Sequence, residues 1–303
     1  MDTMSDDFRG TRPRVAFSLM LKEFPMSRTL RRSAVFAAGA AAILLLSACT
    51  SGTASEGGDA ASDTITPDTL TIATGEPAYA PWVLNDDPES GEGFEAAVAY
   101  AVAEELGYEK SQVEWVRTTF DSAIAPGPKD FDLNLQQFSV NEDRAKAVDF
   151  SSPYYTTTQA VVASAGTDAA DAKSIADLKG ALIGVASGTT SLTVVEDVIA
   201  PTQDLQVFNT VDDVVAALQN GTIDAMVTDL PGAFYVRDAQ LDDGVIVGQL
   251  DSAAGGDDFA IVLPKDSGLT KDVTAAVDAL REDGTLDKLA AEWIADQGAP
   301  VLK

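Results

Sequence analysis

The chain has 303 residues, of which 48 are aspartate or glutamate and 20 are lysine or arginine, and its formal net charge is −28 at pH 7. So acidic a surface repels nucleic acid and anionic lipid alike, which excludes both as electrostatic partners. The sequence contains no histidine, which removes the commonest general base and metal ligand. Serine–histidine and cysteine–histidine catalysis are therefore excluded, and we expect no metal site.

Residues 1–49 predict an export signal. Three arginines between residues 28 and 32 precede about 16 small or apolar residues, a length typical of a secretory signal and shorter than the roughly 20 residues of a membrane span. Met26 is an alternative start, in which case residues 1–25 are a mis-assigned extension. The pair Arg31-Arg32 is compatible with export by the twin-arginine pathway, and export by the Sec pathway is the alternative.

The only cysteine of the sequence, Cys49, ends this apolar run. The segment LSAC at residues 46–49 resembles the lipobox of bacterial lipoproteins, and this resemblance implies a diacylglycerol on the Cys49 thiol. The alternative is a buried free cysteine at the start of a transmembrane segment. Residues 50–68 contain mainly Ser, Thr, Gly, Asp and Ala, so we expect them to form a flexible linker.

From residue 69 onward, strand and helix patterns alternate along the chain. The segment 93–107 shows clear helical spacing, with apolar residues from Phe94 to Leu106 on one face and Gly107 after them. The expected strands cover residues 70–74, 113–116, 131–135, 181–187, 205–209, 222–229, 245–250 and 259–264. The other expected helices cover residues 191–199, 211–221, 269–284 and 285–297. This order predicts an α/β protein with mainly parallel sheets, whose ligand sites lie at the carboxyl ends of the strands.

Six segments occur in an order that resembles the polar amino-acid family of bacterial extracellular solute-binding proteins, the receptors of ABC transporters. They are LTIATGEPAYAPW, GFEAAVAYAVAEELG, FSVNEDRAKAVDFSSPYY, LKGALIGVASGTTS, NGTIDAMVTD and LREDGTLDKLAAEW. The resemblance covers residues 69–296 and implies a two-lobed periplasmic-binding-protein-like fold, with two mainly parallel sheets joined by a two-strand hinge. Residues 69–156 and 258–303 would form lobe 1, and residues 157–257 would form lobe 2. The ligand would bind between the lobes, which close on it.

The resemblance also implies which residues hold the amino-acid backbone of the ligand. Arg144 matches the arginine that holds the α-carboxylate, a role that suits the two parallel hydrogen bonds of a guanidinium. Ser139, Thr189 and Thr190 would complete this contact. Asp229 matches the aspartate that pairs with the α-ammonium. From the residues alone, Arg144 could instead be a surface arginine paired with a neighbouring acid, and Asp229 could cap the following helix.

Five further residues would surround the ligand side chain. Tyr79 and Phe120 match aromatic positions that pack against it. Glu76, Gln136 and Gln137 match positions that select it. The acid Glu76 disfavours a ligand with an acidic side chain, so we expect a neutral polar or cationic amino acid. Gln137 together with Glu76 is most similar to the cystine-binding branch, which makes cystine the first candidate.

One segment, residues 124–132, departs from the family pattern. Pro126 and Pro128 should end the preceding helix early, and their effect on pocket size is open. The whole sequence predicts a lipid-anchored, monomeric receptor on the extracytoplasmic face of the cell membrane, which delivers an amino acid to an ABC transporter permease. Such a receptor needs no cofactor, contacts the membrane through its lipid anchor only and is not an enzyme. The alternative is a dehydratase-like enzyme on the same fold that uses Glu76.

Overall fold

The computed structural model describes residues 63–250, 256–294 and 298–303. The expected export signal, Cys49 and residues 50–62 of the expected linker lie outside this range. Within the described residues, no helix has both the length and the apolar character needed to cross a bilayer.

The segment that precedes the first strand is attached to the body of the protein. The backbone N–H of Ile65 donates a hydrogen bond of 2.8 Å to the Asp132 carboxylate. The same buried carboxylate accepts the N–H of Thr71 at 2.8 Å. Asp132 therefore satisfies two backbone donors and fixes the end of the expected linker at the edge of lobe 1.

Lobe 1 is built on a five-stranded sheet with the strand order β2-β1-β3-β10-β4. Its strands are β1 (Leu70–Gly75), β2 (Val113–Thr118), β3 (Leu133–Asn134), β4 (Val148–Thr157) and β10 (Asp257–Pro264). Both β2 and β3 run parallel to β1, whereas β10 runs antiparallel to β3 and β4. Every residue of β1 is buried, as expected for a strand that is covered on both faces.

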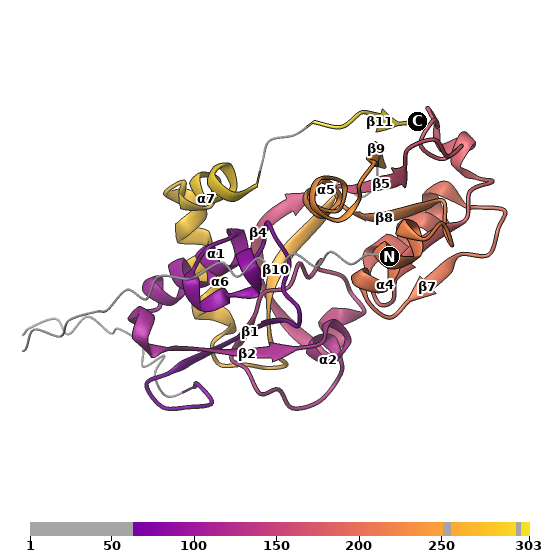
Figure 1. The fold of residues 1–303 in the computed structure, drawn as a ribbon. Helices are drawn as coiled ribbons and strands as arrows, with labels where there is room; N and C mark the ends of the chain where they lie inside the picture. The colour runs from indigo at the N-terminus through magenta and orange to yellow at the C-terminus, as the bar shows by residue number, and fades with distance from the viewer. Residues whose placement is uncertain (1–62, 251–255, 295–297) are drawn as a thin grey trace, which may run out of the picture. The chain divides into compact units, whose positions relative to one another are not determined.

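Three helices of lobe 1 pack against one another (Figure 1). They are α1 (Phe94–Glu105), α6 (Thr270–Glu282) and α7 (Thr285–Trp293). Phe94 of α1 and Val277 of α6 are fully buried in the same apolar cluster, together with Phe259 of β10. Trp82, in the loop that follows β1, is buried in the same cluster. The short helix α2 (Phe120–Ile124) ends just before Pro126, as the sequence predicts.

Lobe 2 is built on a six-stranded sheet with the order β11-β9-β5-β8-β6-β7. Its strands are β5 (Gln159–Ser164), β6 (Ile183–Ala186), β7 (Gln206–Phe208), β8 (Ala225–Asp229), β9 (Gly244–Leu250) and β11 (Val301–Leu302). Its α-helices are α3 (Thr190–Val194), α4 (Val211–Gln219) and α5 (Leu230–Tyr235). Thr210 begins α4 because its side chain accepts the N–H of Asp213 at 3.1 Å. Val214 and Leu218, one turn apart, bury the inner face of this helix.

The chain passes from lobe 1 to lobe 2 between β4 and β5, and it returns between β9 and β10. The outgoing and returning strands pair antiparallel on both sides of the crossing, with Thr157 opposite Asp257 and Gln159 opposite Leu250. The structure therefore has two α/β lobes, as predicted. The sheets are mixed rather than mainly parallel, because a chain that crosses between lobes and comes back must add antiparallel strands to both sheets.

The last residues form a third link between the lobes. After α7, the chain ends on the sheet of lobe 2, where Val301 of β11 lies opposite Gln249 of β9. The backbone N–H of Gln249 donates to the Pro300 carbonyl at 2.7 Å. The sequence expectation had placed residues 258–303 in lobe 1. The structure shows that the final strand belongs to the sheet of lobe 2, since the edge of β9 is available for parallel pairing.

Candidate functional site

A cavity of about 440 Å³ is lined by residues of both lobes. Its wall includes loops at the carboxyl ends of β1, β2, β3, β6, β7 and β8, the position expected for a ligand site in α/β sheets. The ten residues that the sequence predicts for ligand binding all line it: Glu76, Tyr79, Phe120, Gln136, Gln137, Ser139, Arg144, Thr189, Thr190 and Asp229. None of residues 124–132 lines the cavity.

Arg144 is buried at the cavity wall, at the start of the 3-10 turn Arg144–Lys146, and only 7% of its surface is exposed. Its guanidinium donates one hydrogen bond of 2.6 Å to the Ser139 carbonyl and one of 2.8 Å to the Gly188 carbonyl of lobe 2. It also lies over the Phe120 ring, 5.3 Å from the ring centre. The alternative of a surface ion pair does not hold, because the neighbouring Asp143 pairs with Lys146 instead.

The charge of Arg144 is not neutralised by an ion pair within the described residues. Burial lowers the pKa of its guanidinium, and the carboxylates of Asp257 and Asp121 act in the opposite direction. A buried cation that makes bonds only to neutral carbonyls is well suited to accept an anionic group from a ligand.

Three hydroxyl side chains surround this cation. The Ser139 and Thr190 hydroxyls lie 3.3 Å apart and join the two lobes. Thr190 also lies 3.3 Å from the Asp257 carboxylate and donates to it. The Thr189 hydroxyl is already engaged, since it donates to the Ala186 carbonyl at 2.8 Å. A carboxylate bound at Arg144 would therefore have to replace the long contacts of Ser139 and Thr190, whereas the shorter bond of Thr189 shapes the loop after β6.

Asp229 ends β8 and begins α5, where its carboxylate accepts the N–H of Gly232 at 2.9 Å. The expected helix cap is thus present, and the residue also lines the cavity. Burial raises the pKa of Asp229 to about 6, and the nearby Asp257 carboxylate adds to this increase. A cation beside Asp229 would stabilise its ionised form, so the position favours an ammonium group.

Gln137 has a second role that the sequence did not indicate. Its backbone adopts a left-handed conformation with φ of 53°. Its N–H donates to the Glu95 carboxylate at 2.7 Å, and its side-chain amide donates to the same group. The buried Glu95 also accepts the Tyr154 hydroxyl of β4. Burial raises the pKa of Glu95 to about 7, while these three donors oppose the increase.

Gln136 differs from its neighbour. Its side-chain oxygen is buried and accepts no hydrogen bond from any described residue. Its amide nitrogen lies close to Gly75, where an added Cβ atom would be only 2.9 Å away. Glycine at position 75 therefore makes room for the Gln136 side chain, whose buried oxygen is left without a hydrogen-bond donor among the described residues.

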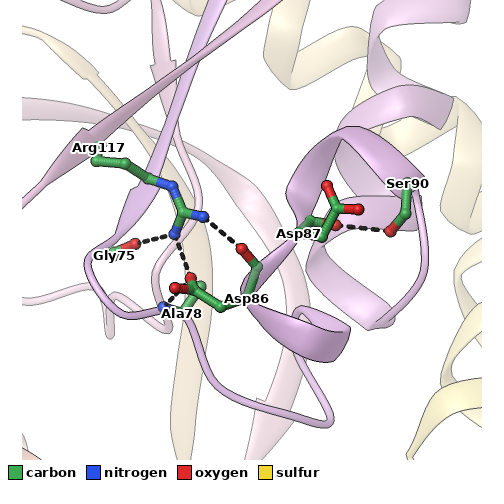
Figure 2. A network of polar contacts seen from close by, with 6 residues as sticks. All are labelled: Gly75, Ala78, Asp86, Asp87, Ser90 and Arg117. Atoms are coloured by element: carbon green, nitrogen blue, oxygen red, sulfur yellow. Dashed lines mark hydrogen bonds and ion pairs between the residues drawn. The ribbon is translucent and has the colours of Figure 1, made fainter.

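The loop that carries Glu76 and Tyr79 is held by a network centred on Arg117 of β2 (Figure 2). The guanidinium of Arg117 donates to the Gly75 carbonyl, to the Asp86 carboxylate and to the Asp86 carbonyl, each at 2.6 Å. The Asp86 carboxylate also accepts the N–H of Ala78 at 2.8 Å. Gly75 is thereby fixed to Arg117 and Ala78 to Asp86, two side chains that pair with each other, and Glu76 between them is exposed at the cavity.

Several cavity residues were not identified from the sequence. Asp121 lies in the first turn of α2, and Asp212 lies in the first turn of α4. Burial and the Asp212 carboxylate together raise the pKa of the Tyr79 phenol, and both residues line the cavity although they belong to different lobes. Gln159 of β5 accepts the Ser191 hydroxyl at 2.6 Å and donates to Asp257 at 2.5 Å. An acid in the first turn of a helix that follows a strand was the available signal for Asp121.

Residues 70–296 match the family model of bacterial extracellular solute-binding proteins, family 3. The chain belongs to this family. Among the curated relatives of this solute-binding protein is an L-arginine-binding protein of Pseudomonas aeruginosa, which is 30% identical over 72% of the chain and 85% of the relative. A glutamate-binding protein of Corynebacterium glutamicum is 28% identical over 90% of the chain and 94% of the relative.

Solved structures agree with the family assignment of this solute-binding protein. An ancestral arginine-binding protein bound to arginine is 31% identical, with a TM-score of 0.62. The similarity covers 75% of the chain and 99% of that structure. The two-lobed α/β fold and the family predicted from the sequence are thereby confirmed. The relatives are named as binding proteins for different amino acids, so the family membership alone does not name the ligand.

Proposed function

We propose that this solute-binding protein is a receptor that binds the backbone of one free amino acid between its lobes and delivers it to an ABC importer. The observation that carries the proposal is the pairing of charges in the cavity. Arg144 is the only lysine or arginine among the described lining residues, and it is buried without an ion pair. Asp229 is a half-buried carboxylate on the other lobe. A zwitterionic α-amino acid supplies the opposite charge to both.

In this arrangement, the α-carboxylate would replace neutral partners of Arg144 and accept the Ser139 and Thr190 hydroxyls. The α-ammonium would contact Asp229. The α-carboxylate then bridges the lobes, because Ser139 and Arg144 come from lobe 1 and Thr190 comes from lobe 2, and the α-ammonium adds a contact to Asp229 of lobe 2. Ligand binding would favour the closed arrangement for this reason.

The enzyme alternative lacks support from the site. Glu76, its proposed acid or base, is exposed and makes no hydrogen bond to another described residue. The relatives are named as binding proteins. Binding and release without chemistry also needs only the groups that the cavity contains.

We further propose that Cys49 carries the lipid anchor and that the receptor acts on the extracytoplasmic face of the membrane. This part rests on the sequence, namely the apolar run before Cys49 and the polar linker after it. Its test is metabolic labelling with a radioactive fatty acid in a bacterial host. The wild-type chain should be labelled and should sediment with membranes. The Cys49→Ala variant should not be labelled and should not sediment with membranes.

The central experiment is calorimetric titration of the full chain with each common amino acid, ornithine, citrulline and cystine. We expect at least one of them to bind with an affinity of order micromolar, about −8 kcal/mol. The Arg144→Ala variant should lose this binding. If the panel contains no ligand, or if Arg144→Ala binds as well as the wild type, the proposed function is wrong.

A further inference from the structure

The charges of the cavity are unbalanced. Its described lining residues include four carboxylates, those of Glu76, Asp121, Asp212 and Asp229, but only one cation, Arg144. A zwitterionic amino acid would use Arg144 for its carboxylate and Asp229 for its ammonium. Three carboxylates then remain at the cavity wall. None of them forms an ion pair with a described lysine or arginine.

The three remaining carboxylates are not equivalent. Asp121 acts on the pKa of Arg144 and therefore lies at the end of the cavity where the ligand carboxylate would bind. Asp212 instead acts on the pKa of Tyr79, which follows Glu76 by three residues on the same loop, and these three residues all line the cavity. The acids on this second side of the cavity come from both lobes, Glu76 from lobe 1 and Asp212 from lobe 2.

An independent observation concerns hydrogen-bond acceptors. The buried oxygen of the Gln136 side chain accepts no hydrogen bond within the described residues, and Gln136 lines the cavity. Leaving such an acceptor without a donor costs free energy. Its amide nitrogen is close to Gly75, the residue before Glu76. The side of the cavity near Glu76 thus combines exposed carboxylates with a buried carbonyl oxygen that lacks a donor among the described residues.

We propose that the amino acid bound by this receptor carries a positive charge on its side chain, and that Glu76 and Asp212 bind this cation together. The inference rests on the proposed function and names its ligand class. A guanidinium or ammonium group supplies both the charge and the several N–H donors that this part of the wall lacks. The aromatic ring of Tyr79, beside Asp212, offers a face for the same cation.

Other ligand classes fit the cavity less well. An acidic side chain would add a negative charge beside Glu76 and Asp212. Cystine, the first candidate from the sequence, has a second ammonium group that these acids could bind. It also has a second carboxylate, for which the described lining residues offer no second cation. A neutral side chain would leave both acids without a partner after the lobes close.

The test compares ligands of equal size and different charge by calorimetric titration of the full chain. L-arginine and L-citrulline differ in one nitrogen and one charge. We expect L-arginine, L-lysine or L-ornithine to bind about tenfold or more tightly than L-citrulline. Raising the salt concentration should reduce the affinity for the cationic ligand more than that for citrulline, because only the former depends on the excess charge.

Variants locate the effect. The Glu76→Gln and Asp212→Asn variants should each reduce the affinity for the cationic ligand about fivefold or more and change the affinity for L-citrulline less than twofold. Glu114→Gln and Asp171→Asn remove equally exposed carboxylates that do not line the cavity, and they should change neither affinity. If L-citrulline, L-glutamine or cystine binds as tightly as L-arginine, L-lysine and L-ornithine, the inference is wrong but the proposed function stands. If no amino acid binds, both are wrong.

Discussion

The guanidinium of Arg144 donates a 2.8 Å hydrogen bond to the carbonyl oxygen of Gly188, and the two residues belong to different lobes. A side chain proposed to bind the ligand thus also joins the lobes in this structure. In this hydrogen bond the buried guanidinium has a neutral acceptor, and a carboxylate would be a stronger acceptor for it. Exchange of the Gly188 carbonyl for a ligand carboxylate would couple binding to the movement of the loop after β6.

Replacing Arg144 should have the largest effect on binding. We expect Arg144→Ala to weaken the affinity for the cognate amino acid about 100-fold or more, because the ligand carboxylate would be buried without a charged donor. Arg144→Lys should recover part of the affinity, since it keeps the charge and loses the two-pronged geometry. Lys146→Ala, two residues away and exposed, is the matched control and should bind normally. Titration calorimetry measures all three.

The stability of the protein should depend on pH through Glu95. The pKa of this buried carboxyl rises from its ordinary value of 4.5 to about 7. The folded state therefore holds a proton that the unfolded chain has released, so Glu95 contributes stability that is complete below pH 4.5 and is lost as the pH rises through 7. Glutamine resembles the protonated glutamate. Between pH 5 and pH 8 the free energy of unfolding of Glu95→Gln should therefore decrease by about 2 kcal/mol less than that of the wild type.

Urea unfolding at pH 5 and pH 8 measures this difference. Glu104→Gln is the control, because Glu104 lies exposed on the same helix, and it should show the wild-type dependence. A Glu95→Gln variant with an unchanged pH dependence would show that the unfolded-state and folded-state pKa values of Glu95 are similar.

Ligand affinity should depend on pH through Asp229. Its pKa is raised from 3.8 to about 6, and an ammonium group binds the ionised form. The affinity should therefore be constant above pH 7 and fall as the pH falls below 6, by up to about tenfold per pH unit. Asp229→Asn should bind weakly and without this dependence, whereas Glu95→Gln should retain it. If the affinity is equal at pH 7 and pH 5, the ligand ammonium does not contact the Asp229 carboxylate.

Gly188 provides a test of the contact between the lobes. Its φ is +71°, and a Cβ atom at this position would lie 2.6 Å from the Asp121 carboxylate. Gly221 has a similar φ of +74° with no atom near the added Cβ. Both Gly188→Ala and Gly221→Ala should lose about 1 kcal/mol of stability from the left-handed backbone. Only Gly188→Ala should also reduce ligand affinity, about tenfold, since the contact with Asp121 would displace the loop that carries Thr189 and Thr190. Equal affinities in the two variants would argue against this contact.

The sequence predicted the cavity residues well where a residue type has a strong chemical meaning. Arg144 and Asp229 lie within recognisable segments. Each side chain has one natural partner in an amino acid, the α-carboxylate for Arg144 and the α-ammonium for Asp229. Glu95 could not be assigned in the same way, because its partners Gln137 and Tyr154 are far away in the chain and only the fold brings them together. Its position after a glycine and a phenylalanine says only that a helix begins there.

The distribution of acids was also out of reach of the sequence. A chain with 48 acidic residues gives no reason to single out Asp212 or Asp121. Asp212 becomes notable only because α4 starts beside the loop of Tyr79. The strand β11 was missed for a similar reason, since Val301–Leu302 is too short to show a strand pattern and is defined by its pairing with β9.

The pairing of β11 with β9 has a mechanical consequence. Two adjacent strands alone would let the lobes rotate about many axes, as a ribbon can both bend and twist. A third connection, from α7 of lobe 1 to the edge strand β11 of lobe 2, adds a constraint on length, because the lobes could separate only as far as this connection extends while β11 stays paired with β9. We therefore expect residues 298–303, which do not line the cavity, to influence how far the lobes can separate.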